Sequence, residues 1–177
     1  MKKLKEFSIP FSGLKVGKHS FEYQIKNTFF EAFDYDEFNE AEVYAKVKLN
    51  KSETMLEFDM HAEGMVNVDC DVTSEPYDQP VAADLNLVVQ FGEEFNDENE
   101  ELLVLPHGEH QINIAQYLYE MLVLAIPTKR VHPGVEDGTL QSEVLEKLKT
   151  MQPKVVVETK EDTDPRWDAL KGLLTDK

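Results

Sequence analysis

The sequence predicts an α+β protein: a β-rich antiparallel meander or partial barrel packed against a buried helix, with a short C-terminal helix. Two observations carry this prediction. Several runs between residues 41 and 91 alternate apolar and polar side chains, the period of a strand with one buried face, and short polar turns separate them. Residues 113–126 then change to the spacing of an amphipathic helix.

The N-terminal part predicts extended chain followed by a short helix. Over residues 7–25, apolar and polar side chains alternate in two runs that are punctuated by glycines. Residues 28–38 carry phenylalanines at roughly helical spacing, which indicates a short amphipathic helix or an irregular turn that begins near Asn27 or Thr28. We expect the aromatic cluster to belong to the core: Phe29, Phe30, Phe33 and Phe38.

Residues 41–91 predict four strands of one sheet. Polar turns are expected at residues 50–53, at Glu63 and Gly64, and at residues 74–80. Strands joined by such short turns favour an antiparallel meander, and the polar alternate positions indicate one face in contact with water. In chain order, the predicted strands are Val43–Leu49, Leu56–Met60, Val66–Val72 and Ala83–Phe91.

An acidic loop and a short strand are expected between this sheet and the helix. Residues 92–101 carry six acidic side chains and no basic one, so we expect a solvated loop, and Leu102–Leu105 predict a short strand. The helix over 113–126 has Asn113 as a candidate cap, and apolar residues surround it almost completely, so it should be largely buried. A further helix is predicted over residues 139–150.

We divide the chain into a single β-rich α+β domain, residues 1–151, and a linker with a docked C-terminal helix, residues 152–177. In the second part, Asp164 suits an N-cap and Pro165 the first helical position. A helix of about two to three turns is marginal alone, so it has to dock on its own sheet or on a partner. Its apolar face consists of Trp167, Leu170 and Leu174.

The charge of the chain limits its partners. It has 18 Lys and Arg residues against 35 Asp and Glu residues, so its formal net charge is −17. Nucleic-acid binding normally uses a basic patch, with Arg as the preferred phosphate partner, yet Arg130 and Arg166 are the only arginines. The composition therefore disfavours autonomous, tight binding to RNA or DNA. It favours a basic protein partner, and a weak RNA contact within an assembly stays open.

The sequence contains few residues that indicate a catalytic or metal-binding site. Cys70 is the only cysteine, which excludes an intramolecular disulfide and a multi-thiolate zinc site. The alternation places it on the apolar face of its strand, so we expect a buried, inert thiol. His107 and His110 suit a polar connection better than a metal site, and no phosphate-binding loop motif occurs. We therefore expect no catalytic residue, no metal and no cofactor.

We expect neither a signal peptide nor a transmembrane helix. No run approaches the ~18 consecutive apolar residues of a transmembrane helix. The basic start of the chain is not followed by the apolar stretch of a signal peptide. We expect a cytoplasmic protein without membrane or DNA partners.

Packing alone does not explain two stretches. Residues 128–133 form a basic run in an acidic chain, and Asp164–Trp167 place the second arginine beside the only tryptophan. Arg and Trp are enriched at interface hot spots. The competing interpretation is that Trp167 covers a hydrophobic edge while Arg166 stays solvated. The candidate residues for contact with a partner or RNA are Lys129, Arg130, Asp164, Pro165, Arg166 and Trp167.

Three segments, in this order, resemble the YceD-like family, bacterial proteins linked to accumulation of large-subunit ribosomal RNA. Gly64–Thr73 resembles the family strand that ends in Cys-x-Arg-Cys. Ile112–Pro127 is similar to its acidic, leucine-rich helix, and Asp164–Leu170 resembles its terminal Asp-Pro-Arg-x-x-x-Leu.

The cysteine motif departs from the family pattern. Only Cys70 is present, while Val72 stands at the arginine position and Thr73 at the second cysteine position. The later cysteine-rich stretch of many members has no counterpart here around residues 132–138. A metal or redox role suspected for the family cysteines therefore does not carry over to this chain.

The resemblance implies a cytoplasmic, non-catalytic factor in large-subunit ribosome production that acts on or near the ribosomal RNA. Because the chain is so acidic, we expect it to work mainly through protein contacts with a basic ribosomal protein or a large-subunit precursor. Ribosomal RNA would be contacted weakly or indirectly, through Lys129, Arg130 and Arg166. The alternative is a small-molecule- or peptide-binding β-rich module unrelated to ribosomes, which needs an apolar pocket inside the sheet.

Overall fold

The computed structural model describes residues 2–99 and 102–151. The chain divides into two compact units, Met1–Gln141 and Ser142–Lys177. In the second unit, helix α4 (Glu143–Met151) confirms the helix predicted over residues 139–150. The helix predicted after Asp164 lies outside the described residues, and the domain division at residue 151 stays a prediction.

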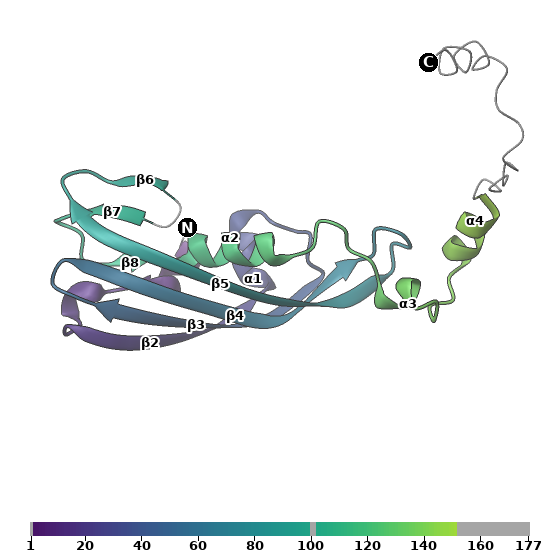
Figure 1. The fold of residues 1–177 in the computed structure, drawn as a ribbon, viewed down its shortest axis with the longest axis horizontal. Helices are drawn as coiled ribbons and strands as arrows, with labels where there is room; N and C mark the ends of the chain where they lie inside the picture. The colour runs from purple at the N-terminus through teal and green to yellow at the C-terminus, as the bar shows by residue number, and fades with distance from the viewer. Residues whose placement is uncertain (1, 100–101, 152–177) are drawn as a thin grey trace, which may run out of the picture. The chain divides into compact units, whose positions relative to one another are not determined.

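A six-stranded sheet forms most of the first unit (Figure 1). Every neighbouring pair is antiparallel except β5 and β7, which run parallel. The predicted α+β class and antiparallel meander are confirmed, and the sheet stays open between its edge strands β2 and β6. In spatial order, the strands are β2 (Gly17–Lys26), β3 (Glu40–Lys51), β4 (Met55–Asp69), β5 (Pro76–Gly92), β7 (Leu102–Pro106) and β6 (Asn96–Asn99).

Residues 41–91 form three long strands instead of the four predicted, because the turn expected at Glu63 and Gly64 is wrong. Strand β4 continues through Gly64, which pairs with Val43 of β3 and Val81 of β5. A Cβ at this position would collide with the carbonyl oxygen of Glu42, so glycine permits the close approach of β3. Apolar residues keep the same parity on both sides of Gly64, and that unbroken alternation is typical of one continuous strand.

The N-terminal segment contains less strand than predicted. Two 3-10 turns, η1 (Lys2–Phe7) and η2 (Phe11–Gly13), flank the short strand β1 (Ser8–Ile9). This strand pairs with β8 (Ile112–Asn113) in a separate two-stranded sheet. Pro10 has no N–H to donate to a ladder, which limits further pairing. The predicted alternation still describes burial, because the apolar positions Phe7, Ile9 and Phe11 are all buried.

The short helix predicted near residue 28 is confirmed. Helix α1 (Asn27–Phe30) continues into the 3-10 turn η3 (Glu31–Phe33), which ends at Asp34 in the left-handed conformation, φ 57°. The aromatic cluster belongs to the core, as expected. Phe33 stacks on Tyr119 with ring centroids 4.3 Å apart, and the buried members are Phe29, Phe30 and Phe38.

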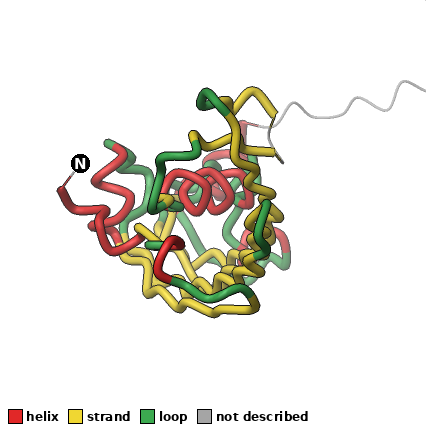
Figure 2. The backbone as a smooth tube through the Cα atoms, turned by 90° about the vertical axis from the view of Figure 1, so that its left-hand side faces the viewer, coloured by secondary structure: helices red, strands yellow, loops and turns green. Residues whose placement is uncertain are grey.

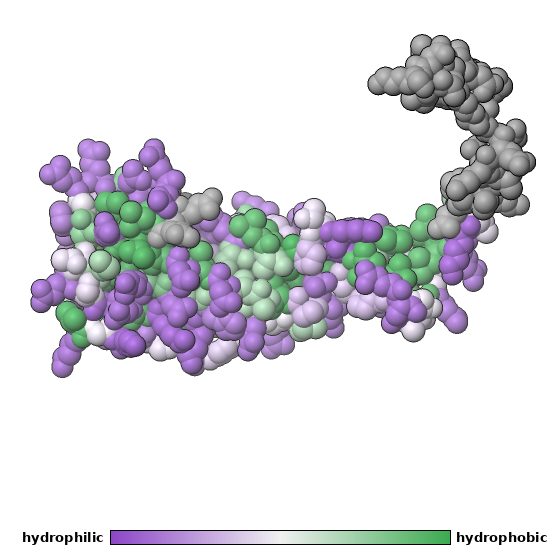
Figure 3. All heavy atoms as spheres, viewed as in Figure 1, coloured by the Kyte–Doolittle hydropathy of each residue, from purple (hydrophilic) through white to green (hydrophobic). Residues whose placement is uncertain are grey.

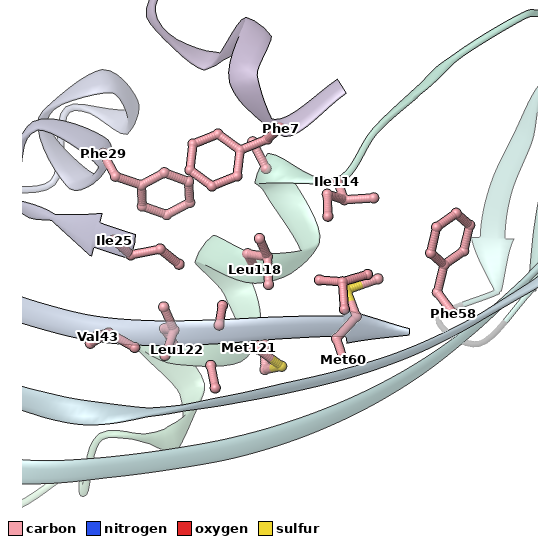
Figure 4. Close-up of a cluster of buried hydrophobic side chains, with 14 of the residues drawn as sticks. Phe7, Ile25, Phe29, Val43, Phe58, Met60, Ile114, Leu118, Met121 and Leu122 are labelled. Atoms are coloured by element: carbon pink, nitrogen blue, oxygen red, sulfur yellow. The ribbon is translucent and has the colours of Figure 1, made fainter. Parts of the chain in front are cut away.

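Helix α2 (Ala115–Ala125) contacts β5, and the strands curve round it when the molecule is viewed end-on (Figure 2). The N-cap position of α2 is Ile114, one residue after the expected Asn113, but the Oδ1 atom of Asn113 still accepts a hydrogen bond from the Ala115 N–H over 2.9 Å. The helix is buried on one face, but Leu124 is 83% exposed, so the burial does not extend all round it. The inward residues Leu118, Met121 and Leu122 lie among Ile25, Val43 and Met60 (Figure 4).

Part of the predicted acidic loop is a strand. Residues 96–99 form β6, which pairs antiparallel with β7 through an irregular register. All four residues of β6 are exposed, so no apolar alternation marks it and the sequence gives no signal for it. Strand β7 confirms the strand predicted at residues 102–105. Because β6 occupies the chain between β5 and β7, β7 returns parallel to β5.

Candidate interaction site

The turn after β4 and the segment after α2 meet in one place, although they are far apart in the sequence. The N–H of Asp71 donates to the carbonyl oxygen of Arg130 over 2.8 Å, and the N–H of Arg130 donates to Oδ2 of Asp71 over 2.7 Å. The N–H of His132 donates to Sγ of Cys70 over 3.3 Å. We call these four residues, Cys70, Asp71, Arg130 and His132, the Cys70–Arg130 junction.

The β4–β5 turn has a fixed shape on one side of the junction. The N–H of Ser74 donates to the carbonyl oxygen of Cys70 over 2.8 Å, and the N–H of Cys70 donates to that of Glu75 over 3.0 Å. Ser74 takes the left-handed conformation with φ 57°, which lets the chain reverse before β5. These bonds hold Cys70 at the end of the strand with its side chain toward the core.

On the other side, a short helix orients His132. Helix α3 (Pro133–Glu136) begins at a proline, which suits the first helical position. The Nδ1 atom of His132 accepts a hydrogen bond from the N–H of Gly134 over 2.9 Å. The imidazole then lies edge-on to Tyr77 of β5, with ring centroids 5.4 Å apart. His132 is therefore a capping and packing residue in this structure.

The guanidinium of Arg130 is engaged inside the molecule. Its Nη1 atom lies 3.0 Å from Oε2 of Glu37, and its Nε atom lies 3.7 Å from Oδ1 of Asp71. The side chain is only 25% exposed. Two carboxylates thus balance the charge of Arg130, and a phosphate would have to compete with them.

The thiol of Cys70 is buried, as predicted, with 1% of the residue exposed. Burial alone would raise the pKa of this thiol. Hydrogen bonds from the backbone of His132, the side chain of Thr73 and the backbone of Val72 and Thr73 outweigh burial and lower the pKa from its ordinary value. The sulfur therefore accepts polar hydrogens within an apolar surround, which the strand alternation did not indicate.

The candidate contact residues fall into three groups. Lys129 is exposed and, in the part of the chain that the structure describes, it has no ion-pair partner. Arg130 is held by Glu37 and Asp71. The predicted contact residues Asp164, Pro165, Arg166 and Trp167 lie outside the described residues.

The sequence did not reveal the acidic partners of Arg130. Glu37 and Asp71 belong to segments that are far from Arg130 in the chain, and each is one of 35 acidic residues. The contact between them depends on the curvature of the sheet and on the path of the chain after α2. Asp71 stands inside the segment that resembles the family strand, which is the one signal that could have drawn attention to it.

Within residues 2–99 and 102–151, no group of three or more His, Cys, Asp or Glu side chains is arranged to hold a metal ion. In the same part of the chain, the helices are all too short or too polar to cross a bilayer.

The chain matches the family model described as large ribosomal RNA subunit accumulation protein YceD over residues 58–174, more than half of its length. It therefore belongs to the YceD family. No curated protein and no solved structure matches the chain. The matched region begins inside β4 and includes both sides of the Cys70–Arg130 junction.

The departure from the family cysteine motif has a structural counterpart. Thr73, which stands at the second cysteine position, has its side chain hydrogen-bonded to the Cys70 thiol. The segment near His132 meets the same thiol through a backbone N–H. In this chain the junction is therefore held by hydrogen bonds and the Arg130 ion pairs.

Proposed function

We propose that this protein is a non-catalytic factor in large-subunit ribosome production that supports accumulation of large-subunit ribosomal RNA mainly through protein contacts. The family match supports the link to this RNA, because the family is described by its accumulation. The net charge of −17 is the observation that carries the preference for a protein partner. Ribosomal proteins are largely basic, and an acidic partner would shield them before assembly.

The environment of Arg130 supports a limited role for direct RNA contact. RNA affinity depends strongly on cations that neutralise phosphates and release counterions. Because Glu37 and Asp71 already balance Arg130, this residue offers little free positive charge in the described structure. Lys129 is exposed and remains a candidate phosphate contact, and we keep Arg166 as the candidate of the C-terminal segment. Few such contacts give weak binding, because few counterions are released.

The alternative function as a small-molecule module has less support. Such a module needs a sizeable apolar pocket inside the sheet. Here α2 and the N-terminal aromatic residues lie on that side of the sheet, where Phe7, Ile114 and Leu118 are almost fully buried (Figure 4). The core thus occupies the space that a ligand would take.

Affinity purification of the tagged full-length protein from cells tests the proposal. We expect large-subunit precursors and at least one basic large-subunit protein to co-purify, and we expect that protein to remain bound after RNase treatment. If no large-subunit component co-purifies, the proposed function is wrong. If all components are lost with RNase, RNA rather than protein is the primary contact, and the protein-contact mechanism is wrong.

A further inference from the structure

An open groove runs along α2 on the side of β6 and β7. Its volume is about 760 Å³, and its walls come from α2, β5, β6, β7 and the chain before α2. Leu103 and Leu105 of β7 form part of its floor and are buried. We call it the α2–β6 groove. The family description assigns no role to this groove, and no residue of the Cys70–Arg130 junction lines it.

Large apolar side chains are exposed in this groove. Leu124 of α2 is 83% exposed and Phe95, just before β6, is 56% exposed, and both line the groove. Figure 3 shows hydrophobic surface over β7 and part of α2, with hydrophilic side chains around it. A single exposed leucine needs no explanation, but two large apolar side chains that line one groove form a surface typical of an interaction site.

The groove is also acidic. Its lining includes Asp84, Asp97 and Glu120 but no lysine or arginine. Asp84 is paired with His61 over 2.7 Å. Asp97 and Glu120 have no cationic partner in the described part of the chain. Burial raises the pKa of Tyr117 in the groove, and the charges of Asp97 and Glu120 raise it further, as expected in a negative potential.

We propose that the α2–β6 groove binds a basic segment of a partner polypeptide. An apolar side chain of that segment packs against Leu124 and Phe95, while its Lys or Arg side chains pair with Asp97 and Glu120. Charge complementarity selects this occupant, because the same acidic lining repels nucleic acid and acidic peptides. The inference rests on the proposed function only in identifying the partner as a basic ribosomal protein.

Fluorescence anisotropy with labelled synthetic peptides tests the groove in the full-length protein. The probes are a peptide of alternating Lys and Leu, the same peptide with Ser for Leu, and one with Glu for Lys. We expect the Lys–Leu peptide to bind more tightly than either other peptide. We expect Leu124→Ser, and the double variant Asp97→Lys with Glu120→Lys, each to weaken that binding about tenfold or more.

Two control variants separate the groove from general effects. Met65→Ser removes an apolar side chain that is 45% exposed on β4, outside the groove lining. Glu31→Lys with Glu53→Lys changes the net charge as much as the groove double variant, at exposed positions outside the groove. We expect both controls to bind the Lys–Leu peptide within about twofold of wild type, with thermal melts of all variants showing that each is folded.

Several outcomes would overturn the proposal. The first is equal affinity of wild type and Leu124→Ser for the Lys–Leu peptide. The second is an equal loss of affinity in the groove double variant and the control double variant, because net charge alone would then explain binding. If Trp167→Ala strengthens peptide binding tenfold, the chain's own C-terminal segment is the occupant. If wild type forms a dimer that Leu124→Ser abolishes, a second copy of the chain is the occupant.

The proposed function and the groove can fail separately. If large-subunit components co-purify equally with wild type and Leu124→Ser, the groove is not their binding site although the function stands. If the Lys–Leu peptide binds as expected but no large-subunit component co-purifies, the groove stands and the proposed function is wrong.

Discussion

The Nη1 atom of Arg130 donates a hydrogen bond to Oε2 of Glu37 across 3.0 Å. Glu37 follows η3, whereas Arg130 follows α2, so this bond joins two segments that are distant in the chain. The second carboxylate, that of Asp71, brings in the β4–β5 turn. One residue of the basic run identified in the sequence, Arg130, thus forms ion pairs within the molecule that hold distant segments together.

These ion pairs predict that substitution of Arg130 lowers the free energy of unfolding more than substitution of Lys129. Arg130→Gln should lower the free energy of unfolding by about 1 kcal/mol, because two carboxylates lose their cation in a half-buried place. Lys129→Gln is the matched control and should change it by less than about 0.5 kcal/mol. Urea denaturation measures both values. Equal effects of the two substitutions would show that the ion pairs add nothing to stability.

Cys70 should be dispensable for function although it contributes to stability. Cys70→Ala should cost about 1 kcal/mol or a little more, because it removes a buried side chain and leaves the His132 N–H without its acceptor. Co-purification of partners should be unchanged. Urea denaturation and affinity purification of the variant check the two parts. A folded variant that has lost its partners would contradict this prediction.

His61 gives a pH dependence that can be tested. The hydrogen bond from its Nδ1 to Asp84 raises the pKa of His61 above the ordinary 6.5, and the charges of Asp84 and Glu63 add to this. A raised folded-state pKa means that protonated His61 stabilises the fold fully below the unfolded-state pKa, and the contribution is lost as pH rises through the folded-state pKa.

Asp84→Asn should therefore move the pKa of His61 down toward 6.5, which an NMR titration of the imidazole measures. Its cost in stability should be larger at about pH 5.5 than at about pH 8.5. In a His61→Asn background this difference between the two pH values should vanish. An unchanged midpoint for His61 in the Asp84→Asn variant would refute the assignment.

Arg166 and Trp167 should separate partner binding from stability. We expect Arg166 to contact the partner, so Arg166→Ala should weaken partner binding by about 1–2 kcal/mol or more while stability changes by less than about 0.5 kcal/mol. Trp167→Ala should reduce both, since it removes the apolar anchor of the predicted helix. Thermal melts and co-purification with each variant provide the two readouts. If Arg166→Ala retains its partners fully, the segment is only structural.

Local patterns in the sequence predicted most of the sheet, because the alternation of apolar residues survives folding. The turn expected at Gly64 failed because a glycine beside an acidic residue resembles a turn, whereas here it serves a close approach of β3. Strand β6 was missed because its exposed polar residues carry no burial pattern. Edge strands defined by backbone pairing alone leave no such signal.

The candidate site was less predictable than the fold, because it depends on contacts between distant segments. The sequence identified Cys70 and Arg130 individually, but their meeting through Asp71 and His132 follows from the path of the chain after α2. The exposure of Leu124 was also hidden, since a helix that is apolar almost all round predicts general burial. The exposure of Leu124 depends on which elements pack against α2, and the sequence does not show this.

We propose above all that this acidic YceD-family protein acts through contacts with other proteins and not through tight binding to RNA. The most direct test is the affinity of the purified protein for naked large-subunit ribosomal RNA at physiological salt. We predict a dissociation constant of about 1 μM or weaker, because few cations are available to contact phosphates. A complex of about 10 nM or tighter under the same conditions would contradict the account.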